Sequence, residues 1–574
     1  MKIPQKILSK LDIIPTLSKR QSFLLIDTII LGIVGALGAR LFNFLLNLIQ
    51  KYSLEWFGGY VPPEPTSSGS VVSGVIGSHG LYFVPIVVII GGIISGFLVY
   101  TWAPDAEGHG TDTVVKAFHQ NNGKIRKRVT PIKLLASAIT IGTGGSAGKE
   151  GPTALFSAGI GSIYATILKK PDDYRRLLIL IGMAAGLSAI FRSPIGTAIF
   201  AIEVLYRDME FEASALIYTM LASIIAYTIN GIFVGWKPLF QIPSNIHITK
   251  SIDYFWFILL GIGSGIVSTF IPVIFYGLRD LFHKIPVKPH FKPAIGALGV
   301  GLVALIYPQV LGGGYGWIEK AINGQLVLSL MLILIFMKIL AFALTVSSGG
   351  SGGVFAPTLY VGAMVGGFFA VVFHQSFASF TIVGMAAVFG SAARVPIATL
   401  LMVTEMTGGY KLLVPAALSV ILAFLIQAQL SRKLKYKSLY EAQVKTIIDS
   451  PVHMVSHLRT VVRLISERHS FKDVDVGSLN FISLLKSGIP LDMPDHKKLF
   501  IGILDKKNPC VGTKIEDFCL HKDDQNWEVA GVLREHHLVI PQSELVLEAK
   551  DQLIIFGTDS AVKSLKEKIK IPLS

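Results

Sequence analysis

The segment Thr140–Thr153 reads TIGTGGSAGKEGPT, and the segment Thr345–Thr358 reads TVSSGGSGGVFAPT. Aligned without a gap, the two segments are identical at seven of 14 positions. A second pair follows them at nearly the same spacing, because Gly182–Leu205 matches Gly384–Thr407, including an Arg, a Pro and a Glu at corresponding positions. Similarity at a nearly fixed spacing indicates a duplicated structural unit.

The duplicated unit lies in a strongly apolar part of the chain. Of the 574 residues, 51% are hydrophobic and 16% are charged, whereas a soluble domain carries about 25% charged residues. Apolar runs long enough to cross about 30 Å of hydrocarbon recur along the chain. They cover about 23–49, 82–102, 132–168, 177–206, 214–235, 254–277, 294–311, 325–346, 354–377, 380–405 and 411–430. We therefore predict an all-α polytopic membrane protein with repeats over about 20–235 and 250–432.

The formal net charge of +15 is explained by where the basic residues lie. They gather at the N-terminus and in four short loops, which are residues 1–20, 124–133, 169–176, 279–292 and 432–437. By the positive-inside rule, these loops and both termini face the cytoplasm. No Lys or Arg lies between Lys51 and Lys116, so we expect the Gly-, Ser- and Pro-rich loop in that window to face outward. This pattern favours a multi-pass protein of the cell membrane in contact with lipid, and it argues against a nucleic-acid partner.

Each repeated segment is a Gly- and Ser-rich break followed by Pro and a helical run. Pro suits the first helical turn, Gly allows backbone to approach closely, and the first N–H groups of a helix lack intrahelical partners. Interrupted helices are tolerated in a membrane only where the freed backbone lines protein or water, and transporter repeats place the substrate where their halves meet. Two such helix starts aimed at one point would form an anion site without a full buried positive charge. The alternative is a pair of helix caps that pack closely through glycine.

Glu150 stands at the first of these breaks, and an acid inside the membrane is a functional residue by default. Ionised, its carboxylate would occupy the anion site; protonated, it would leave the site to a permeant anion. Lys149 beside it either raises the local anion concentration or pairs with an acid. Glu203 and Glu405 lie on repeat-related helices, each nine residues after a Pro. For these two we favour structural carboxylates that accept hydrogen bonds from loop N–H groups, with a proton relay as the alternative.

Other classes of site are not supported by the sequence. Gly148–Lys149 resembles the end of a P-loop, but Thr143 and Glu150 stand where that motif requires Gly and Ser or Thr. A cation transporter would want a carbonyl-lined filter such as TVGYG, and none occurs. The apolar region holds no nucleophile–base pair and no cluster of metal ligands. We therefore expect no enzymatic activity, no metal and no cofactor in the membrane part.

The combined motifs resemble those of the CLC family of chloride channels and chloride/proton antiporters, over about residues 25–440. GKEGP at Gly148–Pro152 is similar to the gating-glutamate motif of that family, and GVFAP at Gly353–Pro357 is similar to its G-x-F-x-P motif. Tyr440 follows the last apolar run, where the family carries a pore tyrosine. The resemblance implies a homodimer with one pore per subunit and an inverted-repeat helical fold. It also implies the roles of individual residues: Glu150 as the external gate, the Tyr440 hydroxyl as the inner boundary of the central site, and anion-binding backbone at Lys149, Gly151, Val354, Phe355 and Ala356.

Two positions depart from the family pattern. The G-S-G-I-P motif appears here as Gly108-His109-Gly110-Thr111-Asp112, so His109 replaces a Ser whose hydroxyl is an anion ligand. An imidazole can still donate a hydrogen bond and can carry charge, so we predict that His109 binds the anion; the alternative is that its ring points away. Val204 stands where the antiporters carry an internal proton acceptor, next to Glu203. Because Val cannot accept a proton, this position favours uncoupled, channel-type chloride conduction gated by Glu150, with chloride/proton antiport as the alternative.

The composition changes after the last apolar run. We place the membrane domain at 1–437 and a small α+β cytoplasmic domain at 438–574, with short strands near Leu499–Leu504, Val529–Leu533, Leu538–Ile540 and Leu553–Gly557, closed by a helix near Ser560–Ile569. Over about 490–570 this region resembles the TrkA-C domain of potassium-uptake regulators. That resemblance implies regulation, through an unidentified small ligand such as a nucleotide.

Overall fold

The computed structural model describes residues 19–66, 74–78, 80–242, 251–447, 449–450, 452, 474–475, 491–492, 497–505, 508, 510–515, 527–534, 537–539 and 544–558. The chain divides into two compact units, Met1–Val444 and Lys445–Ser574. The first unit runs past the boundary that we placed at residue 437, because Leu439 and Tyr440 are buried within it.

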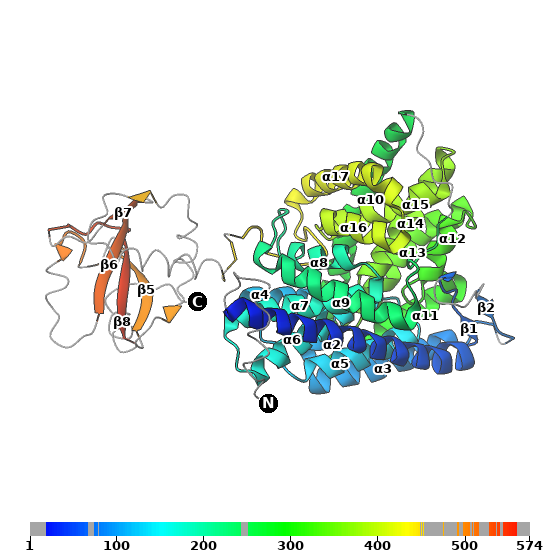
Figure 1. Cartoon of the computed structure of the whole chain (residues 1–574), viewed down its shortest axis with the longest axis horizontal. Helices are drawn as coiled ribbons and strands as arrows, with labels where there is room; N and C mark the ends of the chain where they lie inside the picture. The colour runs from blue at the N-terminus through cyan, green and yellow to red at the C-terminus, as the bar shows by residue number, and fades with distance from the viewer. Residues whose placement is uncertain are drawn as a thin grey trace, which may run out of the picture. The chain divides into compact units, whose positions relative to one another are not determined.

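The helices of the first unit form two successive sets with corresponding order. The first set is α2 (Lys19–Gln50), α3 (Val84–Trp102), α4 (Thr111–Gln120), α5 (Val129–Gly142), α6 (Glu150–Ile167), α7 (Asp172–Phe191), α8 (Pro194–Glu203) and α9 (Leu216–Val234). The second set is α10 (Ile252–Lys284), α11 (Lys292–Ile306), α12 (Tyr315–Ile322), α13 (Leu328–Ser347), α14 (Phe355–Val372), α15 (Phe377–Ala392), α16 (Pro396–Thr407) and α17 (Leu413–Leu430). Figure 1 shows the first set, in blue to green, packed with the second set, in green to yellow.

Short elements connect these helices. They are η1 (Lys51–Phe57), β1 (Tyr60–Val61), β2 (Val75–Ile76), η3 (Pro104–Ala106), η4 (Ala213–Ala215), η5 (Pro289–Phe291), η6 (Pro308–Val310), η7 (Tyr410–Leu412) and η8 (Ser431–Lys433).

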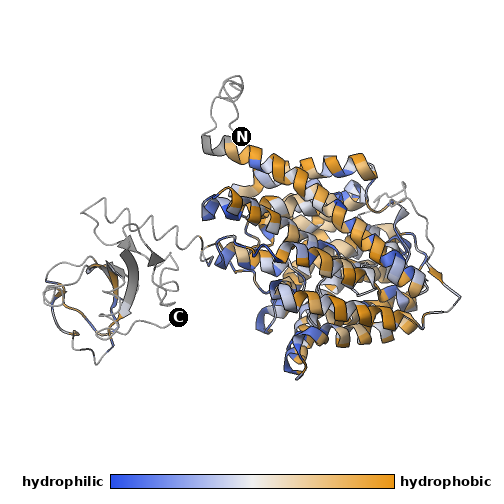
Figure 2. Cartoon of the chain, turned by 90° about the horizontal axis from the view of Figure 1, so that it is seen from below, coloured by the Kyte–Doolittle hydropathy of each residue, from blue (hydrophilic) through white to orange (hydrophobic). Residues whose placement is uncertain are grey.

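Length and apolar composition make many of these helices candidates to cross a membrane. Within the described residues, nine helical segments meet both conditions, and four shorter apolar helices accompany them. Figure 2 shows apolar residues along most of their length, with hydrophilic residues gathered toward helix ends and loops. The apolar runs 132–168, 177–206 and 380–405 each divide into two helices, α5–α6, α7–α8 and α15–α16. The Gly- and Ser-rich break between α5 and α6 was predicted from the sequence. The breaks after α7 and α15 are two or three residues long and contain no Gly, and a Pro begins the helix that follows each of them.

Two carboxylates join the two sets of helices, because each accepts hydrogen bonds from the start of a helix in the other set. Glu203, at the end of α8, accepts hydrogen bonds from Ile397 N (3.2 Å) and Ala398 N (2.6 Å) at the start of α16. Glu405 of α16 accepts from Gly196 N (2.9 Å) at the start of α8 and also from Ser193 Oγ. An acid at a helix N-terminus satisfies N–H groups that have no intrahelical partner. These contacts are those of structural carboxylates, the interpretation that we favoured from the sequence.

Two fully buried lysines hold equivalent loops in the two sets. Lys133 of α5 donates to Ala106 O (3.0 Å) and Gly108 O (2.7 Å), just before α4. Lys338 of α13 donates to Val310 O (2.7 Å) and Gly312 O (2.7 Å), just before α12. We assigned Lys133 to a cytoplasmic basic loop, and this assignment is wrong, because the side chain is fully buried and satisfies carbonyls of an unwound segment. No periodic signal distinguishes such a lysine from its exposed neighbours.

The second unit contains an antiparallel sheet with strand order β3-β7-β6-β8-β5-β4 among its described residues. The strands are β3 (Val474–Asp475), β4 (Leu491–Asp492), β5 (Lys497–Ile503), β6 (Trp527–Arg534), β7 (His537–Val539) and β8 (Gln552–Thr558). A core including Leu504, Trp527, Val532 and Leu553 covers it. Four strands agree with the predicted runs, and the expected helix near Ser560–Ile569 lies outside the described residues.

Replacing Lys338 by Met should destabilise the first unit. The variant leaves Val310 O and Gly312 O buried without their donor, which costs about 1–3 kcal/mol for each orphaned carbonyl. We expect a lower midpoint of thermal unfolding in detergent for Lys338→Met, and an unchanged midpoint for Lys411→Met, whose side chain is exposed. Equal midpoints for Lys338→Met and the unmodified protein would show that these two hydrogen bonds do not hold the loop.

Candidate anion site between two vestibules

The two Gly-rich breaks are hydrogen-bonded directly to each other. Gly148 N donates to Gly353 O (2.8 Å), and Gly353 N donates to Gly148 O (2.6 Å). Gly144 and Gly349 adopt φ of +102° and +100°, a left-handed conformation that favours glycine at both turns. Ser146 N also donates to Thr345 Oγ1 of the other break (3.0 Å). The unwound backbone of each repeat thus finds its hydrogen-bonding partners in the other repeat, which is what a break inside a membrane requires.

Three helix N-termini converge beside this pair. α6 begins at Glu150, α14 begins at Phe355 and α4 begins at Thr111. The first residues of all three helices line one small cavity, which is too tight to admit a water molecule. We call this space the closed cavity; it is lined by Thr111, Glu150, Gly151, Leu187, Phe191, Phe200, Val354, Phe355 and Tyr440. Because free N–H groups and positive dipole ends gather there, an anion is the species that it can stabilise.

The carboxylate of Glu150 occupies this anion-attracting position. The side chain is 2% exposed, and its Oε2 accepts a hydrogen bond from Ala356 N of α14 (3.4 Å). Oε2 lies so close to Gly148 that a Cβ there would come within 2.0 Å of it. Oε1 has no hydrogen-bonding partner among the described residues. The carboxylate therefore lies at the converging helix N-termini, with one oxygen on the Ala356 N–H group.

Two larger spaces are lined by residues next in sequence to those of the closed cavity. One, of about 530 Å³, is lined by residues including Arg40, Glu64, Lys149 and Arg192; we call it the Lys149 vestibule. Lys149 faces this space with its Nζ near Asn43 Oδ1 (3.4 Å) and above the Tyr315 ring. Lys149 thus lines the approach rather than the closed cavity.

The other space, of about 1290 Å³, is lined by residues including His109, Asp112, Lys116, Arg126 and Arg279; we call it the His109 vestibule. Basic lining residues outnumber acidic ones in both vestibules. Such lining raises the local concentration of anions.

The structure brings most of the predicted site residues together. Glu150, Gly151, Val354, Phe355 and Tyr440 all line the closed cavity. Ala356 contributes the N–H group that contacts the Glu150 carboxylate. Tyr440 is 2% exposed, and its segment is held by two hydrogen bonds: Leu439 N donates to Ala392 O at the end of α15 (2.9 Å), and Ser438 Oγ donates to Tyr440 O (3.0 Å).

His109, which we predicted to bind the anion, lines the His109 vestibule and not the closed cavity. Nε2 lies 3.2 Å from Asp112 Oδ2, and the ring packs beside that of Tyr440, with centroids 5.5 Å apart.

Thr111, which sequence reasoning missed, lines the closed cavity. The sequence signal that could have identified Thr111 is Gly110 directly before it. Gly110 has a φ of +87° and immediately precedes the first residue of α4. α4 is short and polar, so it gave no apolar run that would have predicted a helix start there.

Neither Glu203 nor Val204, at the end of α8, lines the closed cavity. Val204 is fully buried at the C-terminal end of α8, and both oxygens of Glu203 accept backbone hydrogen bonds from α16.

Comparison with known proteins agrees with this geometry. Residues 91–428 match the family model described as voltage gated chloride channel, and residues 503–570 match the TrkA-C domain. The chain belongs to the CLC family. The CLC chain is 29% identical over 361 residues to the H(+)/Cl(-) exchange transporter ClcA of Cronobacter sakazakii, covering 60% of this chain and 77% of the relative. It is 27% identical over 380 residues to ClcA of Salmonella arizonae, covering 63% of this chain and 80% of the relative.

Solved structures confirm the predicted CLC fold. A CLC-type fluoride/proton antiporter superposes with a TM-score of 0.63 at 22% identity, covering 75% of this CLC chain and all of the neighbour. A slow cyanobacterial Cl-/H+ antiporter gives the same TM-score and identity, and the match covers 73% of this CLC chain and 96% of the neighbour. The CLC chain is therefore a multi-pass membrane protein for anion transport, with an additional TrkA-C domain.

Replacing Gly151 by Ala should disrupt the site. A Cβ at Gly151 would lie 1.9 Å from His109 O and 3.0 Å from Gly353 Cα, so the backbone of three segments would have to shift. We expect a large loss of folded protein after extraction and a lower unfolding midpoint. Gly277→Ala is the matched control, because it is a helical glycine with nothing within 4 Å of its added Cβ. Normal yield and stability for Gly151→Ala would contradict the close packing described here.

Proposed function

We propose that this CLC chain exchanges chloride for protons and that Glu150 serves both ions. The observation that carries the proposal is the Glu150 carboxylate lying in the closed cavity at three converging helix N-termini. An anion and an ionised carboxylate compete for the same N–H groups there. Protonation removes the carboxylate's charge, so the side chain leaves and chloride enters.

Chloride needs partial positive charge rather than a full cation at such a site. Helix N-termini supply free N–H groups and about half an elementary charge each. The Thr111 and Tyr440 side chains line the same cavity and add hydroxyl groups, which can donate hydrogen bonds to an anion. A site of this kind holds chloride without trapping it, which conduction and exchange both require.

The coupling of chloride to protons is supported by the relatives. Both ClcA proteins are named H(+)/Cl(-) exchange transporters. In this mechanism Glu150 accepts a proton when chloride displaces it and releases the proton when it returns. The carboxylate cannot be ionised in the cavity while chloride fills the cavity, and this exclusion links the two fluxes.

The placement of charge supports an orientation. The His109 vestibule is lined by Lys124, Arg126 and Lys292, which belong to the basic loops, so by the positive-inside rule it opens to the cytoplasm. The Lys149 vestibule then opens outward, and both termini lie in the cytoplasm of a cell-membrane protein. We propose that two copies assemble as a homodimer and that the TrkA-C domain regulates transport through a small ligand.

A second candidate function is uncoupled chloride conduction. It rests on Val204, which is fully buried and apolar at the position where the antiporters of the family carry an acid. If no other group passes protons from the cytoplasmic side, Glu150 would gate a channel rather than an exchanger.

Coupled flux in liposomes separates these two functions. A chloride gradient imposed across liposomes containing the full chain should drive protons uphill, because each chloride that enters the closed cavity displaces a proton-carrying Glu150. Chloride flux with no uphill proton movement would favour the channel and would refute the exchange proposal.

Glu150→Gln should leave anion flux but abolish its link to protons. Gln has a similar size, carries no charge and cannot titrate, so chloride has no competitor for the cavity. We expect chloride flux in the unmodified protein to rise as the pH at the Lys149 vestibule falls, and flux in Glu150→Gln to stay high at every pH. A folded Glu150→Gln protein that conducts no chloride would show that Glu150 is required for conduction itself.

A further inference from the structure

We propose that His109 and Asp112 form the proton-transferring pair on the cytoplasmic side of the exchanger, in place of the acid that Val204 replaces. The proposal rests on the exchange function proposed above and names the group through which protons reach Glu150. It assigns a function to the residue that departs most clearly from the family pattern.

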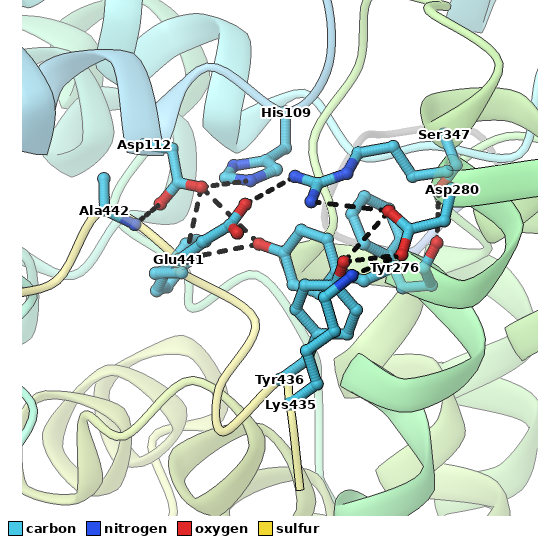
Figure 3. A network of polar contacts seen from close by, with 12 residues as sticks. His109, Asp112, Tyr276, Asp280, Ser347, Lys435, Tyr436, Glu441 and Ala442 are labelled. Carbon is cyan, nitrogen blue, oxygen red and sulfur yellow. Dashed lines mark hydrogen bonds and ion pairs between the residues drawn. The ribbon is translucent and has the colours of Figure 1, made fainter. Parts of the chain in front are cut away.

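The pair stands at the wall between the His109 vestibule and the closed cavity. Figure 3 shows the imidazole directed toward the Asp112 carboxylate, with Nε2 3.2 Å from Oδ2. The Asp112 side chain is 24% exposed, whereas that of His109 is 7% exposed. Asp112 therefore meets water in the vestibule, and His109 lies deeper. The ring of His109 in turn packs beside Tyr440, which lines the closed cavity with Glu150.

The second ring nitrogen is the observation that points to proton transfer. Nδ1 of His109 is buried and has no hydrogen-bonding partner among the described residues. A buried polar atom normally has a partner, so an exception calls for an explanation. A water molecule would supply one. An imidazole with one nitrogen on a carboxylate and the other open to such a species is arranged to pass a proton.

The other acids near the vestibule are already engaged. Asp105 pairs with Arg126 Nε (2.5 Å), and Glu441 pairs with Arg279 Nη1 (2.5 Å). Glu107 is hydrogen-bonded to Tyr100, and Glu203 accepts two backbone hydrogen bonds. Asp112 is the acid of this lining that contacts a buried imidazole.

Asp112 is also held rigidly enough to orient the ring. Its carboxylate accepts hydrogen bonds from Glu441 N (3.2 Å), Ala442 N (3.2 Å) and the Tyr276 hydroxyl (3.5 Å). Figure 3 shows these contacts converging on the carboxylate from α10 and from the segment that follows α17. A carboxylate held by these hydrogen bonds fixes the orientation of the imidazole that it contacts.

Charges on every neighbouring element act on the ring. The titratable or charged groups that surround it are Glu107 before α4, Asp112 on α4, Tyr276 and Arg279 on α10, Lys133 on α5, Glu150 on α6, and Tyr440 and Glu441 after α17. Lys133 donates to Gly108 O beside the ring, and Arg279 is paired with Glu441. Asp112 is thus the charge in direct contact with the imidazole.

The proton balance of the step is simple. With Nε2–H directed at the Asp112 carboxylate, Nδ1 is the free basic nitrogen; it accepts a proton from vestibule water and gives the same proton, through a bridging water, to the Glu150 carboxylate once that side chain has left the closed cavity. The ring ends in the tautomer in which it began, so no further proton is needed to reset it. No bond other than N–H and O–H forms or breaks, and the charged ring is neutralised by Asp112. An entering proton therefore leaves no uncompensated positive charge that would hold chloride in place.

Proton and chloride fluxes of the full-length protein in liposomes test the proposal. We expect His109→Gln and Asp112→Asn each to reduce the protons moved per chloride by about tenfold or more, since positioned proton transfer contributes factors of that size or larger. Chloride flux should change little. Asp112→Glu should restore part of the coupling, because it restores an acid. His283→Gln is the matched control, an exposed imidazole that lines the same vestibule.

A second measurement separates proton transfer from a structural role. In the Glu150→Gln background no proton is carried, so His109→Gln should leave chloride flux unchanged there if its role is proton transfer. A loss of chloride flux in that background would overturn the proposal in favour of a structural role. Coupling by the unmodified protein that persists in both His109→Gln and Asp112→Asn would overturn it while leaving the exchange function intact. Absence of coupling in the unmodified protein would remove the exchange function, and this proposal with it.

Discussion

The structure of this CLC chain depends on one pair of backbone hydrogen bonds, the reciprocal contact of Gly148 with Gly353. A helix broken inside a membrane leaves N–H and C=O groups that lipid cannot satisfy. Here the unpaired backbone groups at the break in each repeat form hydrogen bonds with the break in the other repeat. The contact needs glycine because a Cβ at Gly353 would come within 2.8 Å of Gly151 N and 2.9 Å of Gly148 O. Once the breaks are joined, the helices that follow them must start side by side.

This convergence gives the site its chemistry. α6 and α14 start beside the glycine pair, and α4 is brought to the same point because Gly352 N donates to Gly108 O (3.2 Å). The buried Lys133 donates hydrogen bonds to the carbonyl groups just before α4. Glu203 of α8 accepts a hydrogen bond from the start of α16, and Glu405 of α16 accepts one from the start of α8, so these two helices are held together. Lys133 and Lys338 satisfy loop carbonyls, and Glu203 and Glu405 satisfy N–H groups at helix starts, whereas Glu150 lies in the closed cavity.

The sequence predicted the duplicated helical fold because the duplication leaves repeated motifs. The Gly- and Ser-rich breaks identified α6 and α14, and Glu150 stood out as an acid in an apolar run. For His109, motif alignment placed the backbone but could not say which space the side chain lines, and the structure places it at the His109 vestibule. Thr111 was missed because α4 is too short and polar to give a periodic signal. Lys133 was misplaced because its partners are carbonyls that only the folded loop presents. The channel interpretation rested on Val204 alone, and a single position does not exclude protons that pass through other groups.

The central claim is that the closed cavity is an anion site that the Glu150 carboxylate fills in the absence of anion. Bromide scatters anomalously and can stand in for chloride, so diffraction from bromide-soaked crystals locates the anion directly. In crystals of Glu150→Gln, the account predicts a bromide peak among Thr111, Gly151, Phe355 and Tyr440. Crystals of the unmodified protein at high pH should show the carboxylate there instead. An empty cavity in Glu150→Gln, with bromide bound only in the vestibules, would contradict the account.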